Sequence, residues 1–149
     1  MLRKQCPLNM EMDIDHFKRV NDRYGHQAGD DILIELVRST HAVLRSVNSL
    51  GRIGGEEFLI MLPETNLSQA KEVAERLCLN VSNTPFLILE NQTIKITVSI
   101  GITIFDPSLQ PFEDKSSLMR QFLYEADMAM YQAKAAGRNQ VAIWNGLKS

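Results

Sequence analysis

The sequence has little cysteine, little net charge and no long apolar run. Its two cysteines, Cys6 and Cys78, lie outside any spacing typical of a metal site, so we expect two reduced thiols. The formal net charge of −2 argues against a protein that binds DNA or RNA through a broad basic surface, because the phosphate backbone requires many cations. A local basic pocket for a single nucleotide is still compatible with this charge.

The sequence also lacks any stretch approaching the roughly 18 apolar residues of a membrane span. The N-terminal residues include basic side chains but no apolar segment behind them, which excludes a signal peptide. We therefore expect a cytoplasmic chain without direct membrane contact, although a parent protein could be anchored through parts outside it. The 149 residues contain no repeat, linker or low-complexity segment, which predicts one domain over residues 1–149.

The first half of the chain contains a strand pattern followed by a helix pattern. Apolar and polar residues alternate over residues 8–14, which predicts a half-buried strand. Residues 17–30 are rich in Asn, Asp, Gly and charge, which is typical of a turn or an irregular segment. Apolar residues three and four apart predict an amphipathic helix over residues 30–47, with Asp30 or Asp31 at its N-terminus.

The second half of the chain alternates strands and helices. A strand pair flanks Gly54-Gly55, and a helix capped by Asn66 or Ser68 follows it. Apolar residues at even positions predict one long strand over residues 94–104 that buries a single face. A helix over residues 116–136, ended by Gly137, and a strand over residues 141–144 complete the chain. The order β-α-β-β-α-β-α-β predicts an α/β (α+β) fold, a mixed sheet flanked by helices.

Two acidic groups have the chemistry of a metal site. Asp13 and Asp15 end the first strand, and carboxylates at a strand end suit Mg²⁺, although this motif alone is more typical of a turn. Glu56 and Glu57 follow a Gly-Gly turn whose backbone can approach a ligand closely. Adjacent strand residues face opposite ways, so at most one glutamate would share a metal with Asp13. A plain hairpin explains Gly54 to Glu57 equally well.

Two polar groups have the chemistry of a nucleotide site. Lys134 and Arg138 could bind phosphates, but cations at the end of a helix also simply complement its dipole. Asn21, His26 and Asp30 could contact the edge of a base, or could serve only as capping and turn residues. For each group taken alone, the structural explanation is the simpler one.

Four motifs in order resemble the GGDEF family of diguanylate cyclases. They are DIDHFKRVNDRYGHQAGD, RIGGEEF, TVSIGIT and ADMAMYQAKAAGRNQV, spread from residue 13 to residue 141. The resemblance covers nearly the whole chain, with GGEEF as a variant of the signature. It implies a palm-like, ferredoxin-like fold of the nucleotide-cyclase type. It also implies an enzyme that condenses two GTP molecules into cyclic di-GMP and two pyrophosphates, across a homodimer of facing active sites.

The resemblance also implies roles for the acidic residues. Asp13, the carbonyl of Ile14 and Glu56 would hold Mg²⁺ or Mn²⁺. Glu56 would in addition accept the proton of the 3′-hydroxyl group, while Glu57 is the second acid of the signature and has no defined task. Lys18 would stabilise charge on the phosphates. Such a reaction depends on positioning and charge neutralisation more than on covalent catalysis.

The substrate-binding residues follow from the same motifs. Two side chains would read guanine, one would lie close to the nucleotide, one glycine would let the backbone pass the phosphates and two cations would bind the terminal phosphates. In that order they are Asn21 and Asp30, His26, Gly55, and Lys134 and Arg138.

The sequence departs from the family pattern in two places. Many members have an Arg-x-x-Asp site for product inhibition before the signature, and here the same spacing reads Arg45-Ser46-Val47-Asn48. Asn48 supplies no carboxylate, so we predict weak or absent feedback inhibition. The helix that usually precedes the first strand, and any input domain, are expected to be absent from this chain. A non-catalytic GTP-binding regulatory domain is therefore the alternative function.

Overall fold

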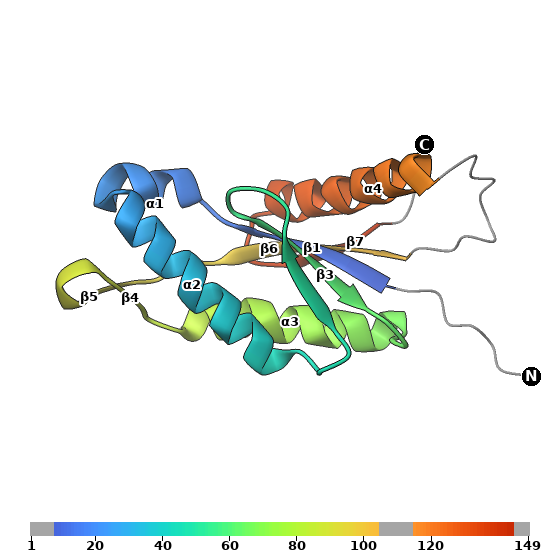
Figure 1. The fold of residues 1–149 in the computed structure, drawn as a ribbon, viewed down its shortest axis with the longest axis horizontal. Coiled ribbons are helices and arrows are strands. Elements are labelled where there is room, and N and C mark those ends of the chain that lie inside the picture. The colour runs from blue at the N-terminus through green and yellow to red at the C-terminus, as the bar shows by residue number, and fades with distance from the viewer. Residues whose placement is uncertain (1–7, 105–114, 145–149) are drawn as a thin grey trace, which may run out of the picture.

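The fold is a five-stranded mixed sheet with helices on both faces (Figure 1). The computed structural model describes residues 8–104 and 115–144. In the sheet the strands run in the order β2-β3-β1-β6-β7, and β4 and β5 form a separate hairpin. In chain order the elements are β1 (Leu8–Ile14), α1 (Phe17–Tyr24), α2 (His26–Val43), β2 (Ser49–Arg52), β3 (Glu57–Leu62), α3 (Leu67–Asn83), β4 (Phe86–Ile88), the short 3₁₀ helix η1 (Leu89–Asn91), β5 (Gln92–Ile94), β6 (Val98–Ile104), α4 (Lys115–Ala135) and β7 (Val141–Ile143).

The central strand β1 is antiparallel to both of its neighbours, and the edge strand β7 runs parallel to β6. Helix α4 lies over one face of the sheet, and α2 and α3 lie on the other side (Figure 1). The even-numbered residues of β1 join the apolar core shared with α2 and α3. These features confirm the predicted fold class, a mixed sheet flanked by helices.

Helix α4 approaches β6 closely because β6 contains a glycine at their crossing. A Cβ atom at Gly101 would lie 2.8 Å from the carbonyl oxygen of Ala126 and 2.8 Å from the carbonyl carbon of Ala129. Both are backbone atoms of α4, so they cannot swing aside as the end of a side chain can. The absence of a side chain at Gly101 therefore sets how deeply α4 packs onto the sheet.

The prediction of an irregular segment over residues 17–30 was wrong. Residues Phe17–Tyr24 form α1, and α2 begins at His26 with Gly25 as its N-cap residue, so neither Asp30 nor Asp31 caps it. Phe17, Val20 and Tyr24 have helical spacing and pack against the core, although polar residues surround them in the sequence. Gly25 separates the two helices with a φ of 92°, a conformation that favours glycine.

Two strand predictions also need correction. All seven residues of β1 are buried, because α4 covers the face that was expected to meet solvent. The long strand over residues 94–104 is divided into β5 and β6, since Ile94 pairs with β4 whereas Val98 pairs with β1. The even positions 98, 100 and 102 are buried as expected, but their odd-numbered neighbours are buried as well.

Two other helix ends follow the predicted capping chemistry. Asn66 caps α3: its side chain accepts a hydrogen bond of 2.8 Å from the Gln69 backbone N–H, and the Gln69 side chain accepts one from Asn66. Gly137, with a φ of 127°, ends α4, and the Arg138 N–H donates to the carbonyl oxygen of Ala133. None of the helices in the described residues has both the length and the apolar character needed to cross a bilayer.

Candidate functional site

The C-terminal end of β1 meets the turn that joins β2 to β3. The backbone N–H of Ile14 donates to the carbonyl oxygen of Glu56 at 3.3 Å, and Asp13 lies opposite Glu57 in the pairing of β1 with β3. The tertiary fold thus brings together Asp13, Ile14 and Glu56, the three residues that the sequence suggested as metal ligands. They come from two segments of the chain that β pairing places side by side.

The β2–β3 turn is held by an arginine that the sequence analysis did not single out. Arg52 donates from Nε to the carbonyl oxygen of Gly54 at 3.0 Å, and from Nη2 to that of Gly55 at 2.7 Å. Neither glycine has a positive φ, so their value lies in the absence of a side chain rather than in an unusual backbone conformation. Gly55 is exposed, and a Cβ there would meet nothing within 4 Å, which leaves its backbone open to a ligand.

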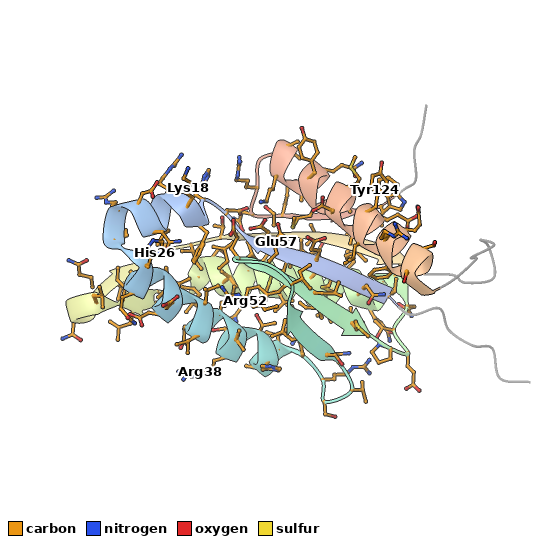
Figure 2. All side chains as sticks on the ribbon, turned by 45° about the horizontal axis from the view of Figure 1, so that its top comes forward. Lys18, His26, Arg38, Arg52, Glu57 and Tyr124 are labelled. Atoms are coloured by element: carbon orange, nitrogen blue, oxygen red, sulfur yellow. The ribbon has the colours of Figure 1, made fainter. Side chains whose placement is uncertain are left out.

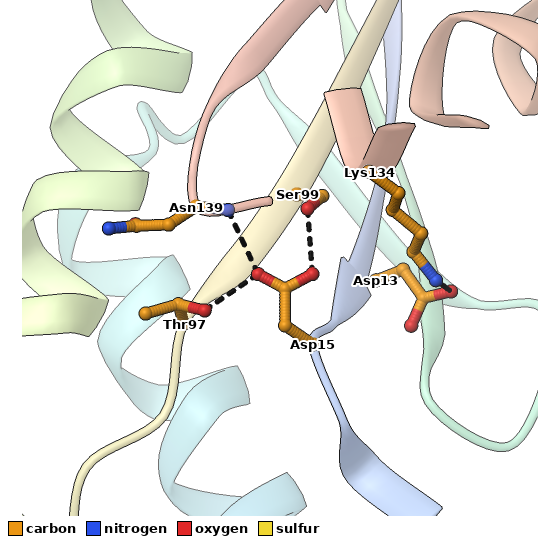
Figure 3. Close-up of polar contacts among 6 residues, drawn as sticks. All are labelled: Asp13, Asp15, Thr97, Ser99, Lys134 and Asn139. Atoms are coloured by element: carbon orange, nitrogen blue, oxygen red, sulfur yellow. Dashed lines mark hydrogen bonds and ion pairs between the residues drawn. The ribbon is translucent and has the colours of Figure 1, made fainter. Parts of the chain in front are cut away.

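Asp13 forms an ion pair with Lys134, which lies in the last turn of α4 (Figure 3). Lys134 Nζ is 2.6 Å from Asp13 Oδ2, and the side chains are 28% and 4% exposed. Burial raises the pKa of the Asp13 carboxyl to about 6, although the hydrogen bond and the charge of Lys134 act in the opposite direction. Within the described residues, Asp13 Oδ1 is buried and has no hydrogen-bond partner. A further cation beside this oxygen would favour the charged carboxylate.

Asp15 connects separate segments of the chain at this site, because it accepts three hydrogen bonds (Figure 3). Thr97 Oγ1 donates at 2.6 Å, Ser99 Oγ at 2.7 Å and the backbone N–H of Asn139 at 3.0 Å. These contacts tie the end of β1 to the start of β6 and to the turn after α4, which contains Arg138. The sequence placed Asp15 at a strand end, but it held no local signal for partners more than 80 residues away.

A second acidic group lies under the β2–β3 turn, on the face of the sheet covered by α4. One carboxylate oxygen from each of Glu11, Glu57 and Asp127 lies within 4.8 Å of the others. Glu11 is only 2% exposed. Burial, followed by the nearby charges of Asp127, Glu57 and Asp13, raises the pKa of Glu11 to about 8. Such a cluster can hold a cation or retain a proton, and sequence analysis missed Glu11 because it expected that face of β1 to meet solvent.

The residues predicted to contact a base lie along α1 and α2. Asn21 is on α1, and its Oδ1 lies against Gly29 of α2. His26 begins α2, while Asp30 is exposed one turn further along the same helix. Figure 2 shows Lys18 on α1 above His26, with Glu57 at the hairpin turn near the middle of the molecule. The residues predicted to contact a base therefore lie on the two helices that follow the end of β1.

A large cavity in the described part of the chain is lined by Asp15, but by none of the residues that the family resemblance assigns to Mg²⁺, guanine or phosphate. That cavity, of about 590 Å³, lies between α1 and β5, and its walls include Arg19, Arg23 and Lys95. It uses a different side of α1 from Lys18 and Asn21. Arg138 is exposed within the turn after α4 and has a φ of 64°. The cavity thus reaches the end of β1 at Asp15, whereas Asp13, Glu56 and Lys134 do not line it.

Comparison with known proteins points to one family. The sequence profile described as "Diguanylate cyclase, GGDEF domain" matches residues 3–140. Diguanylate cyclase A of Treponema denticola is 37% identical over 132 residues, which make up 89% of this chain and 33% of that protein. The active GGEEF domain of a diguanylate cyclase from Vibrio cholerae is 31% identical with a TM-score of 0.79, and the match covers 96% of this chain and 85% of that one.

A further structure, the GGDEF domain of DgcB from Caulobacter crescentus in complex with c-di-GMP, is 30% identical with a TM-score of 0.81. The match covers 95% of this chain and 80% of that one. The chain spans about a third or less of the length of the curated relatives that it matches. The family profile covers most of the chain, these identities are 30% or more and the folds agree. The chain therefore belongs to the GGDEF domain family of diguanylate cyclases.

Proposed function

We propose that this domain is a diguanylate cyclase, which joins two GTP molecules into cyclic di-GMP and releases two pyrophosphates. The observation that carries the proposal is that β pairing places Glu56 beside the end of β1, where the Ile14 N–H donates to its carbonyl oxygen and its charge acts on Asp13, while the ammonium group of Lys134 pairs with Asp13. A carboxylate pair and a cation are what a reaction between a hydroxyl group and a phosphate ester requires. Burying Asp13 is costly, which argues for a role beyond packing.

Asp13, the carbonyl of Ile14 and Glu56 would hold Mg²⁺ or Mn²⁺. The donors fit such an ion because all are hard oxygen atoms, and because Asp13 Oδ1 is buried and lacks a partner among the described residues. When bound, the ion would lower the pKa of the 3′-hydroxyl group and offset charge on the phosphates. Glu56 would accept the proton of that hydroxyl group, and Glu57 would support the same turn as its neighbour.

The cationic residues would bind the phosphates. Lys134 already contacts Asp13, so its ammonium group is held beside the reacting centre. Arg138 follows within the turn anchored by Asp15, and Lys18 approaches from α1. In our proposal Lys134 and Arg138 bind the terminal phosphates, Lys18 stabilises the developing charge, and the backbone at Gly55 passes close to them.

The base would bind along α1 and α2. Asn21 and Asp30 would hydrogen-bond to guanine, with His26 close to the nucleotide. Each site would hold one GTP, so two domains must face one another for the two 3′-oxygens to attack. We therefore propose a homodimer as the catalytic species, which predicts that activity per domain rises with protein concentration.

Product inhibition through the position of Arg45 and Asn48 should be weak. Asn48 Oδ1 accepts a hydrogen bond of 2.8 Å from the Arg45 backbone N–H, and the Arg45 guanidinium group donates to Thr65 Oγ1 at 3.0 Å. An amide at position 48 offers no negative charge to complete a site of the Arg-x-x-Asp type. Calorimetry with cyclic di-GMP tests this proposal, and sub-micromolar binding that Arg45→Ala abolishes would contradict it.

The decisive experiment incubates the purified protein with GTP and Mg²⁺ at several protein concentrations and separates the products by chromatography. We expect cyclic di-GMP from the wild type, and a loss of at least a hundredfold in Glu56→Gln. Glu75→Gln serves as the matched control, because Glu75 lies on α3 with a side chain that is 60% exposed. GTP binding without any product would favour the alternative, a non-catalytic regulatory domain. Unchanged turnover in Glu56→Gln would refute its assigned roles.

A further inference from the structure

Helix α2 contains a glycine, and a side chain of α1 occupies the space beside it. Gly29 is the fourth residue of α2 and does not have a positive φ, so its backbone does not require glycine. Glycine there is less favourable than alanine for the helix itself. A Cβ atom at Gly29 would overlap Asn21 Oδ1 and would lie 3.1 Å from Asn21 Cγ. The side chain of Asn21 therefore occupies the space that a residue other than glycine would fill.

The amide group of Asn21 lies with its oxygen toward Gly29. Asn21 Oδ1 is buried and has no hydrogen-bond partner within the described ranges. The nitrogen Nδ2 does not share this buried, unpartnered state. The residue as a whole is half-buried, so the NH₂ group is the part of the amide that faces outward. An outward NH₂ group can only donate a hydrogen bond. The next residue after Gly29 is Asp30, whose exposed carboxylate can only accept when it is charged.

We propose that Gly29 is a positioning residue that sets the purine preference of the site by holding the Asn21 amide with its NH₂ group outward. The proposal rests on the proposed function, since it assigns the base at that same site. A donor beside an acceptor matches guanine, which presents an acceptor at O6 and donors at N1 and N2. Adenine presents a donor at N6 and an acceptor at N1. Its N6 donor would therefore face the NH₂ donor of Asn21, and its N1 acceptor would face the carboxylate of Asp30.

Alanine at position 29 would displace the Asn21 amide and remove the oriented donor. The test measures the affinity of each variant for 3′-deoxy-GTP and 3′-deoxy-ATP by calorimetry in Mg²⁺. These analogues lack the attacking hydroxyl group, so they bind without reacting. For Gly29→Ala we expect an affinity for 3′-deoxy-GTP at least about tenfold weaker than wild type, and a smaller ratio of guanine to adenine binding.

Three further variants separate a positioning role from a general packing defect. Gly51→Ala is the control glycine, because a Cβ there would meet nothing within 4 Å, and it should bind like the wild type. In an Asn21→Ala background, Gly29→Ala should weaken binding by less than about twofold, since the residue through which it acts is gone. Asn21→Asp keeps the shape of the side chain but replaces the NH₂ group by oxygen, so it should lose the guanine preference even if Gly29→Ala fails to fold.

The possible results decide between the two proposals. If the wild type prefers 3′-deoxy-GTP and Gly29→Ala has the same preference, the positioning role is wrong while the cyclase function stands. If Gly29→Ala weakens binding equally with and without Asn21, the effect passes through Phe17, whose ring would lie 3.1 Å from the added Cβ, and the inference is again overturned. If the wild type binds neither analogue and makes no cyclic di-GMP, both proposals fall.

Discussion

Replacing Glu11 by glutamine would remove an ionisable group that the fold buries beside three other acids. Glu11 is 2% exposed, and burial raises the pKa of its carboxyl from 4.5 to about 8. Near neutral pH the folded protein therefore holds a proton at Glu11 that the unfolded chain releases. Because the folded state binds more protons than the unfolded state between these two pKa values, stability falls as the pH rises from about 4.5 to about 8.

The magnitude follows from the size of this shift. Each pH unit within the window removes up to about 1.4 kcal/mol, so roughly 3 kcal/mol of stability is lost between pH 5.5 and pH 8. Glutamine has the shape of the protonated acid and can donate to Glu57 in the same way, but it releases no proton. Glu11→Gln should therefore already be about 1.4 kcal/mol more stable than the wild type at pH 5.5, and its advantage should grow by roughly a further 3 kcal/mol at pH 8, which widens the difference in Tm by about 6–12 °C.

Thermal unfolding at both pH values, in EDTA so that divalent ions do not contribute, measures the difference. Glu75→Gln, which removes an exposed carboxylate on α3, should shift the stability by no more than about 0.5 kcal/mol at either pH. If Glu11→Gln differs from the wild type by the same amount at pH 5.5 and pH 8, then Glu11 does not titrate in this window. The argument from burial would then be refuted.

Three further changes test single contacts of the fold, each by thermal unfolding. Gly101→Ala should destabilise by about 1–3 kcal/mol, because the added Cβ meets the backbone of α4, while Gly51→Ala should be nearly neutral; equal effects would contradict this. Asn66→Ala should cost about 1 kcal/mol through loss of the capping box, and an unchanged Tm would show that α3 does not need it. Asp15→Asn should cost about 2–3 kcal/mol, since one acceptor oxygen becomes a donor facing its former donors; a neutral result would argue against the three-bond arrangement.

Much of the local structure could be predicted because it depends on neighbouring residues. The hairpin at Gly54-Gly55, the cap at Asn66 and the stop at Gly137 follow from the conformations and hydrogen bonds that those residue types favour. Helix α1 was missed for the opposite reason. Its apolar residues are few and lie among polar ones, so the helix depends on contacts with the core that no short window of sequence contains.

The site shows the same division. The sequence singled out Asp13, Glu56 and Lys134 as residues with suitable chemistry, but each had a structural explanation that was at least as good when considered alone. The ion pair between Asp13 and Lys134 joins residues 121 positions apart, and it exists because α4 crosses the sheet above β1. The hydrogen bonds of Asp15 and the acidic cluster around Glu11 became visible only with the fold, since their partners lie far away in the chain.

The sequence by itself determined the family, the order of most elements and the residue types available for metal, base and phosphate, because these are properties of motifs and periodicity. The tertiary structure alone decided which carboxyl groups are buried and which of them face one another. It also decided that the side chain of Asn21 occupies the space that a side chain at position 29 would fill. Burial and charge proximity arise between residues distant in the chain, and they set the pKa values of Glu11 and Asp13, which composition cannot reveal.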